Sequence, residues 1–158
     1  MKVNIGPYPR GGDEERTVDI VIDPYDTWSM DHTLALLIVP MLKQLKATKH
    51  GAPSVGDEHV PEHLRSTAAP SKENEWDIDE NHFKRWDYVL DEMIWAMEQI
   101  VNDDNEDQFY DHSEVDEDTD IMRQISATKC DYEGLKKHHA RIANGTKLFG
   151  IFFQSLWD

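Results

Sequence analysis

Residues 77–101 read "DIDENHFKRWDYVLDEMIWAMEQIV" and carry the strongest helical signal in the chain. Their apolar side chains recur at steps of three and four residues, which predicts an amphipathic helix with one buried stripe. Asp77 or Asp79 is expected to cap this helix, because a carboxylate there accepts the first free amides and suits the helix dipole. The stripe comprises Phe83, Trp86, Leu90, Met93, Met97, Ile100 and Val101.

A second helix is predicted from Thr27 or Ser29 to about Lys49, with Gly51 in the usual position after its end. Its centre, "LALLIVPML", is apolar on nearly every side, so we expect it to be buried all round. Pro40 lies inside this run and predicts a kink, because proline cannot donate the helical hydrogen bond.

The last helix is predicted over residues 131–157, and a short helix is predicted within 118–125. Glycines weaken the last helix, by about 1 kcal/mol each relative to alanine, and indicate close approach of a neighbour or ligand. These glycines are Gly134, Gly145 and Gly150. The apolar face comprises Leu135, Ile142, Phe149, Phe152 and Leu156.

Residues 2–5 and 16–23 read as two strands joined by a turn-rich segment, which predicts a hairpin. Residues 50–78 form a long proline-rich connection with one helical turn expected at "PEHLRS", and it is a candidate lid. The expected fold is therefore α+β, with an N-terminal β-hairpin packed on a bundle of three main helices. We expect residues 1–158 to form a single domain.

Composition favours an ordered protein, because the 158 residues include five tryptophans, which disordered chains lack. The single cysteine excludes an internal disulfide and a multi-cysteine zinc site, and it suits a reducing cytoplasm. The longest apolar run, residues 34–39, is too short to span a bilayer. A soluble, intracellular protein with no membrane partner is expected.

The net charge of −16 is unevenly distributed. Residues 102–120 form an acidic loop with ten acids and no lysine or arginine, whereas residues 121–158 carry a net charge of +3. A cationic footprint for nucleic acid is absent as a global feature, so direct binding to nucleic acid is not expected.

Several phrases of the sequence resemble a family of uncharacterised proteins encoded by tailed bacteriophages. They include "IDPYDTWSMDHTLALLIVPMLKQLKATKHG", "VPEHLRS", "NHFKRWDYVLDEMIWAMEQ" and "DYEGLKKHHARIANG", and the resemblance covers residues 16–158. It implies a viral origin and a place in the host cytoplasm, but no activity and no catalytic residues. Small phage proteins of this kind are often accessory factors acting on the host, including inhibitors of antiphage defence.

A ligand site is predicted at the start of the helix over 77–101. Lys84 and Arg85 beside Trp86 suit a phosphate and a stacked base, and His82 shares a face with Asp79. The alternative interpretation places Trp86 in the core and the cations in surface ion pairs.

A second cationic group lies on the last helix and could hold an anionic partner. Equally, it could neutralise the acidic loop folded over it. The group comprises Lys136, Lys137, His139, Arg141 and Lys147.

Residues 23–35, "DPYDTWSMDHTLA", place Trp28, Asp31 and His32 where a strand ends and a helix begins. If a pocket forms there, we expect His82 and Arg85 to share it. Carboxylates and an imidazole could also hold a divalent metal for a hydrolase, from Asp26, Asp31, His32 and His82. The same acids and hydroxyls are also the usual residues of a capped helix start.

Residues 103–114 match an EF-hand calcium loop in part, although Gln108 replaces the glycine that the turn requires. A solvated acidic loop is the alternative. The matching positions are Asp103, Asn105, Asp107, Asp111 and Glu114.

The leading hypothesis is a phage accessory protein, not an enzyme, that sequesters a nucleotide-like or anionic small molecule such as a host immune signal. No cofactor or metal is assigned, because no P-loop, GxGxxG, GxSxG, HExxH or CxxC motif occurs. One alternative is an acidic inhibitor or DNA mimic directed at a basic host protein, and another is the metal-dependent hydrolase. A homo-oligomer is compatible with each. The expected ligand contacts are Trp28, His32, His82, Arg85, Trp86, His139 and Arg141.

Overall fold

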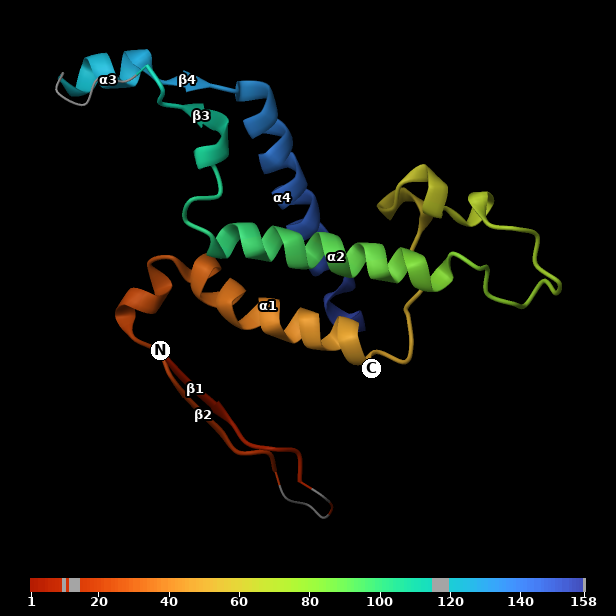
Figure 1. Ribbon diagram of the computed structural model, residues 1–158. Coiled ribbons are helices and arrows are strands. Elements are labelled where there is room, and N and C mark those ends of the chain that lie inside the picture. Colours follow the sequence, from red (N-terminus) through yellow and green to blue (C-terminus); the bar gives the residue numbers. More distant parts are fainter. Residues whose placement is uncertain (10, 12–14, 115–119, 158) are drawn as a thin grey trace.

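The computed structural model describes residues 1–9, 11, 15–114 and 120–157. Its body consists of α1 (Met30–Thr48), α2 (His82–Val101) and α4 (Tyr132–Phe152). Helices α1 and α2 lie side by side and antiparallel, and α4 crosses α2 (Figure 1). Of the described residues, 58% are helical and 8% lie in strands, which is consistent with the α+β class.

Helix α2 is the centre of the core, as its apolar stripe predicts. Trp86, Leu90 and Met93 are fully buried, and the residues around them come from α1, α4 and the connection before α2. Phe83 differs, because it lies in the first turn, where its exposed ring contacts the ring of His82 at its edge. The stripe is therefore buried only where α2 packs against both α1 and α4.

Gly145 sets the distance between α2 and α4. A Cβ atom at this position would lie 2.4 Å from the Cβ of Ala96 and 2.4 Å from the backbone oxygen of Glu92. The predicted close approach at a glycine is confirmed here, since any side chain at position 145 would push the helices apart. At Gly150, one turn further along α4, a Cβ atom would meet nothing within 4 Å.

Burial of α1 on all sides was expected, and this expectation is wrong. Only Ala35 and Leu42 are buried, whereas Leu34, Leu37 and Met41 are exposed. The reason is that α1 packs on α2 along one side and meets only the end of α4 on another. Pro40 is accommodated inside α1, whose helical run continues through it.

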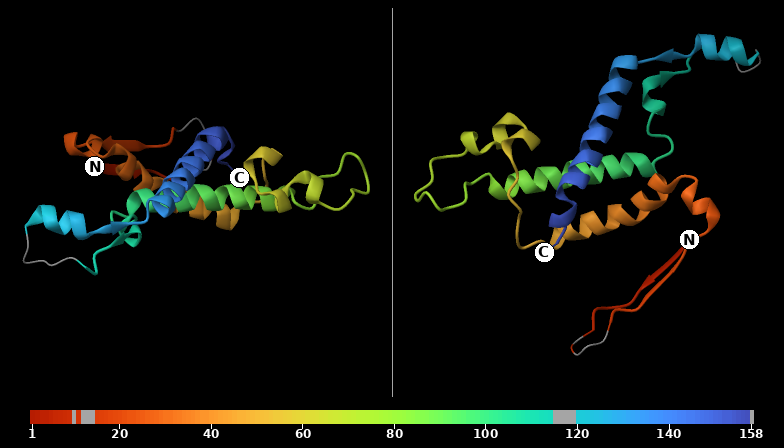
Figure 2. Two further views of the ribbon diagram at one scale, coloured as in Figure 1. Left: turned by 90° about the horizontal axis from the view of Figure 1, so that it is seen from above. Right: turned by 180° about the vertical axis from the view of Figure 1, so that it is seen from behind.

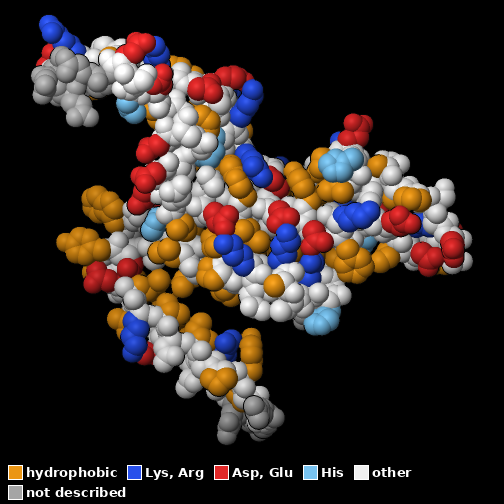
Figure 3. Space-filling model, in the orientation of Figure 1, with side chains coloured by type: hydrophobic (Ala, Val, Ile, Leu, Met, Phe, Trp, Pro, Cys, Tyr) orange, Lys and Arg blue, Asp and Glu red, His pale blue; other side chains and the backbone are white. Residues whose placement is uncertain are grey.

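Three ion pairs, which we call the charge ladder, join α1 to α2 along their solvent side. The lysines lie on α1 or directly after its end, the acids all lie on α2, and Figure 3 shows the alternating charges over this part of the molecule. The antiparallel direction of the helices places later lysines against earlier acids. The pairs are Lys43–Glu98 at 2.6 Å, Lys46–Asp91, and Lys49–Asp87 at 2.6 Å.

The predicted hairpin forms, but it does not pack on the helices. Strands β1 (Lys2–Ile5) and β2 (Val18–Val21) pair antiparallel, and every residue of both strands is exposed. The hairpin stands off from the helical body in Figure 1 and in the right view of Figure 2. Its direction is set by the short helix η1 (Pro24–Thr27), which turns the chain between β2 and α1 and is held by a capping box at Asp23.

The connection before α2 contributes to the core. Val55 and Val60 are buried among the core residues. The helical turn expected near residues 61–66 is present as η3 (Glu62–Leu64). Two further turns flank it, η2 (Asp57–His59) and η4 (Ser66–Ala68).

Between α2 and α4 the chain forms a projection, which we call the acidic arm (residues 102–114 and 120–131; Figure 1). The predicted short helix is confirmed as α3 (Ile121–Ala127), and Asp120 caps it by accepting from the amides of Met122 and Arg123. Residues 115–119 of the predicted acidic loop lie outside the described residues. The other elements of the arm are η5 (Asp107–Phe109) and the paired strands β3 (Tyr110–Asp111) and β4 (Lys129–Cys130).

Across the ranges that the structure describes, no helix combines the length and the apolar character needed to cross a membrane.

Candidate functional site

The start of α2 is held by a buried ion pair. Arg85 is 5% exposed, and its guanidinium donates to both oxygens of Asp79 at 2.8 and 2.7 Å. Hydrogen bonding from Arg85 lowers the pKa of Asp79 to about 2. The same guanidinium lies 3.4 Å from the carbonyl oxygen of Leu64 in η3. Arg85 therefore fastens the connection to α2, and its charge is already neutralised.

Asn81 and His82 make further contacts to the connection. The buried Asn81 amide donates to the carbonyl oxygens of His63 and Arg65 at 3.4 and 3.3 Å. His82 is half-buried, and its Nε2 lies 3.3 Å from the carbonyl oxygen of Ala52. Asp79, expected as a capping residue, instead pairs with Arg85, because the helix begins three residues later than Asp79.

Trp86, expected to stack on a ligand base, lies in the core. It is 1% exposed, and its ring contacts Phe152 of α4 with 5.5 Å between centroids. The alternative interpretation of this residue, as a core side chain, fits the structure. An indole with no exposed face has no surface to offer to a bound base.

Three of the five members of the second cationic group have acidic partners, which are Glu133 for Lys137, Glu106 for His139 and Glu92 for Arg141. Arg141 of α4 donates to both carboxylate oxygens of the buried Glu92 of α2, at 3.0 and 2.7 Å. Its guanidinium carbon lies 3.9 Å from the ring centroid of Trp95. Glu92 thereby receives the counter-charge that burial of a carboxylate requires.

The adjacent histidines of α4 point to different partners. His139 Nε2 lies 2.6 Å from Oε1 of Glu106, which matches the idea that this helix neutralises the acidic loop. His138 is buried, its Nε2 lies 2.9 Å from Oδ1 of Asn105, and its ring contacts Trp95 and Phe109.

His138 is one of the buried polar residues that the sequence interpretation missed, together with Asn81 and Glu92. His138 lies three residues after Leu135 and four before Ile142, so the period of the apolar face could have identified it.

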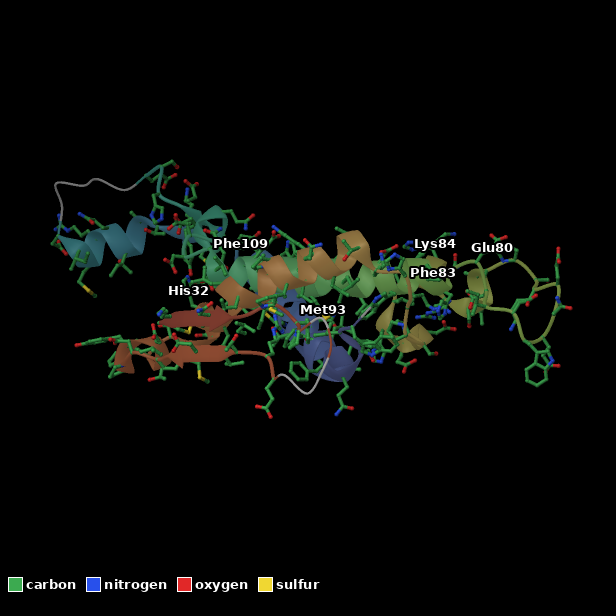
Figure 4. The ribbon with its side chains drawn as sticks, turned by 90° about the horizontal axis from the view of Figure 1, so that it is seen from below. His32, Glu80, Phe83, Lys84, Met93 and Phe109 are labelled. Carbon is green, nitrogen blue, oxygen red and sulfur yellow. The ribbon has the colours of Figure 1, made fainter. Side chains whose placement is uncertain are left out.

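The residues at the start of α1 do not meet those at the start of α2. Trp28 is 89% exposed and His32 is half-buried, both at the N-terminal end of α1. Because α1 and α2 are antiparallel, this end lies opposite to His82 and Arg85, at a distance on the order of the ~30 Å length of a 20-residue helix. Figure 4 shows His32 at one end of the helix pair and Phe83 and Lys84 at the other. The pocket expected to join these residues is therefore not formed.

The metal-ligand sets do not assemble either. Among the described residues, no group of three or more histidines, cysteines and acids is arranged to hold a metal ion. Asp26 completes the capping box of η1, where its carboxylate accepts from the amide of Asp23 at 2.7 Å. In the calcium-loop segment, Asn105 contacts His138 and Glu114 pairs with Lys129.

The best-formed hollow is an apolar groove of about 300 Å³ between α1 and the end of α4. It continues over a shallower region that ends at Trp157. No charged residue lines either part, so it does not suit a nucleotide phosphate. The residues of this apolar groove are Ile38, Met41, Leu42, Leu45, Phe149, Phe153 and Leu156.

The structure thus places the seven expected ligand contacts in three separate regions: the start of α1, the start of α2 and the middle of α4.

Protein-family models, curated proteins and solved structures were compared with this chain, and none matches it.

Proposed function

We propose that this chain is a phage accessory protein that binds a basic host protein in the host cytoplasm through its acidic arm, without catalysis. The observation that carries the proposal is the contrast between its charges. Asp103, Asp104 and Asp107 are exposed and have no cationic partner among the described residues. The arginines expected to bind an anion, Arg85 and Arg141, each donate two hydrogen bonds to a carboxylate of the chain itself.

The geometry gives less support to capture of a nucleotide-like molecule. Such a ligand would have to displace Asp79 or Glu92 from its arginine, and each displacement would leave a poorly solvated carboxylate without a counter-charge. Trp86 would remain out of reach in the core. Binding through the exposed Asp103, Asp104 and Asp107 needs no such rearrangement.

The shape of the arm also supports contact with a macromolecule. The outer part of the arm stands clear of the helical body (Figure 2), and Asp103, Asp104 and Asp107 are exposed at its base. Residues 102–114 alone hold six acids and no lysine or arginine. Concentrated exposed charge of one sign speeds encounter with a partner of the other sign.

The test compares two variants with the same change of charge. The first is Asp103→Asn with Asp104→Asn and Asp107→Asn, and it neutralises the arm. The control is Glu73→Gln with Glu75→Gln and Glu80→Gln, at exposed positions of the connection. Each is used to capture proteins from extract of a bacterial host at rising salt.

We expect the wild type and the control to retain one basic protein that added duplex DNA displaces, and the arm variant to lose it. Retention should fall steeply with salt, because exposed charges are screened within about 8 Å at physiological ionic strength. Equal retention by both variants, or retention insensitive to salt, would show that the acidic arm is not the binding surface.

A further inference from the structure

The β1–β2 hairpin has one apolar face, and none of the residues that the structure describes buries it. Residues directly opposite each other on paired strands project to the same side. The register pairs Val3 with Ile20 and Ile5 with Val18, so these four apolar side chains share a face. The other face is mainly polar, with Lys2, Asn4 and Asp19 beside Val21, and Lys2 Nζ lies 3.2 Å from a carboxylate oxygen of Asp19 there.

A free hairpin of this kind is at most marginally stable in water, because its apolar face is exposed to solvent on both strands. Figure 3 shows apolar side chains along the projecting hairpin. Val18 and Ile20 are 60% and 49% exposed, although alternation of apolar and polar residues usually marks a buried face. The sequence pattern thus requires a covering surface that the isolated chain does not supply.

The total exposed surface leads to the same conclusion. The chain exposes 11771 Å². A compact monomer of 18.4 kDa is expected to expose roughly 8,200 Å². The excess of roughly 3,600 Å² is several times the ~800 Å² that each partner buries in a standard interface. One interface can therefore cover the hairpin and still leave the acidic arm free.

A matching surface lies on α1. Leu34, Leu37, Ile38, Met41 and Leu45 follow the helical spacing of a single stripe, and the last three line the apolar groove. From the first to the last of these residues the stripe runs about 17 Å along the helix. Four residues of a strand cover about 13 Å, so the hairpin face fits the length of the stripe.

Charge also favours contact between these two surfaces. The chain carries −16, yet residues 1–22 hold three basic and four acidic residues, and the apolar groove holds none. Two copies can therefore meet here without bringing their acidic regions together.

The hairpin of one chain does not lie on its own groove, since every residue of both strands is exposed. The capping box joining Asp23 and Asp26 fixes the turn between β2 and α1, and the hairpin leaves the body from that turn (Figures 1 and 2). A second copy of the chain, by contrast, supplies a groove for the hairpin of the first copy and a hairpin for its groove. In a two-fold dimer the same contact forms twice, each hairpin lying on the partner's groove.

We propose that two copies of this chain form such a reciprocal dimer, in which the apolar face of each hairpin packs on the α1–α4 apolar groove of the other copy. The proposal does not depend on the acidic arm, which lies at the other end of α4 from the groove. Loss of host-protein capture and loss of the dimer are therefore separate outcomes.

The test measures mass in solution by light scattering during size exclusion, for the wild type and two matched pairs of variants. Ile20→Asp places a charge on the apolar face of the hairpin, and Val21→Asp places it on the polar face one residue along. Met41→Asp charges the groove, and Leu36→Asp charges an exposed position on another side of α1. Helical circular dichroism verifies that each variant is folded.

We expect the wild type, Val21→Asp and Leu36→Asp to have twice the mass of the 18.4 kDa chain, and Ile20→Asp and Met41→Asp to be monomers. A monomeric wild type at micromolar concentration would overturn the proposal. Loss of the dimer in both members of a pair would also overturn it, because the effect would then not depend on the face.

A mixing experiment identifies which surfaces meet. A mixture of Ile20→Asp and Met41→Asp retains one intact hairpin and one intact groove on different chains. We expect heterodimers there, detected by a tag on one variant, with weaker association than the wild type. The double variant carrying both changes should form none. If pairing occurred between two hairpins, Met41→Asp would remain dimeric, and the proposed contact would be wrong.

Discussion

Arg85 and Asp79 face each other with two parallel hydrogen bonds, Nη1 to Oδ1 at 2.8 Å and Nη2 to Oδ2 at 2.7 Å. Both side chains are largely buried, at 6% and 16% exposure. The pair joins the first turn of α2 to the chain segment before it, while the neighbouring Asn81 holds the turns of the connection. It therefore contributes to the fold at a place where the sequence pattern favours a ligand.

Replacing Arg85 should destabilise the protein markedly. Arg85→Ala leaves the carboxylate of Asp79 buried without a cation, and we expect the free energy of unfolding to fall by about 3 kcal/mol. The control is Arg123→Ala, whose exposed pair with Asp120 should contribute less than about 1 kcal/mol. Urea unfolding followed by circular dichroism measures both, and similar losses in the two variants would contradict this role for Arg85.

The Asp79 pair should also make stability depend on pH in the acid range. The pKa of Asp79 is lowered from 3.8 to about 2, mainly by the hydrogen bond from Arg85, so the folded state binds this proton more weakly than the unfolded state. The resulting stabilisation of about 2 kcal/mol is complete above the unfolded pKa and is lost as pH falls from about 4 to about 2.

Carboxyl carbon chemical shifts can measure this titration directly. We expect a midpoint near 2 for Asp79 in the wild type, and a return toward the ordinary value of 3.8 in Arg85→Ala at conditions where that variant is folded. An unchanged midpoint in the variant would show that the arginine is not the cause.

Two glycines of α4 should respond to alanine with opposite signs. At Gly145 the new Cβ would lie 2.4 Å from Ala96 and from the backbone of Glu92, so Gly145→Ala should cost about 1–3 kcal/mol through overpacking. At Gly150 nothing lies within 4 Å, so Gly150→Ala should stabilise by up to about 1 kcal/mol through helix propensity. Thermal unfolding distinguishes them, and a stabilising change at Gly145 would refute the close crossing.

His138 should hold the base of the acidic arm, residues 105–111, in an ordered conformation. Its buried ring holds Asn105 and Phe109, so His138→Ala should speed hydrogen exchange at the amides of residues 105–111. The matched change His139→Ala removes an exposed ion pair with Glu106 and should have a smaller effect. Exchange measured by mass spectrometry reports both, and amides in the centre of α2 serve as an internal reference.

The helices were predictable because each has a periodic apolar face or a capping residue in its own sequence. The stripe of α2 and the cap of α3 at Asp120 are local signals of this kind. The exposure of α1 was not predictable, because "LALLIVPML" looks the same whether its neighbours are helices of one chain or surfaces of a partner. The placement of the hairpin failed for the same reason, since alternation identifies an apolar face but not what covers it.

The expected site failed for a different reason. Lys84, Arg85 and Trp86 are adjacent in sequence, yet a helix turns each by about 100° from the last. Arg85 and Trp86 consequently face the connection and the core, while Lys84 is exposed. Whether a cation is free or paired depends on acids distant in the chain, such as Glu92 for Arg141, and no local pattern indicates that pairing.

The contact of Gly145 with Ala96 has a consequence for recognising relatives of this chain. The combined volume of these two positions is limited by the helix crossing, so relatives with this fold should keep both small, or enlarge one only where the other is glycine. The same coupling should link the charges at positions 92 and 141. Paired substitution at these positions would reveal common ancestry among sequences too divergent for overall identity to show it.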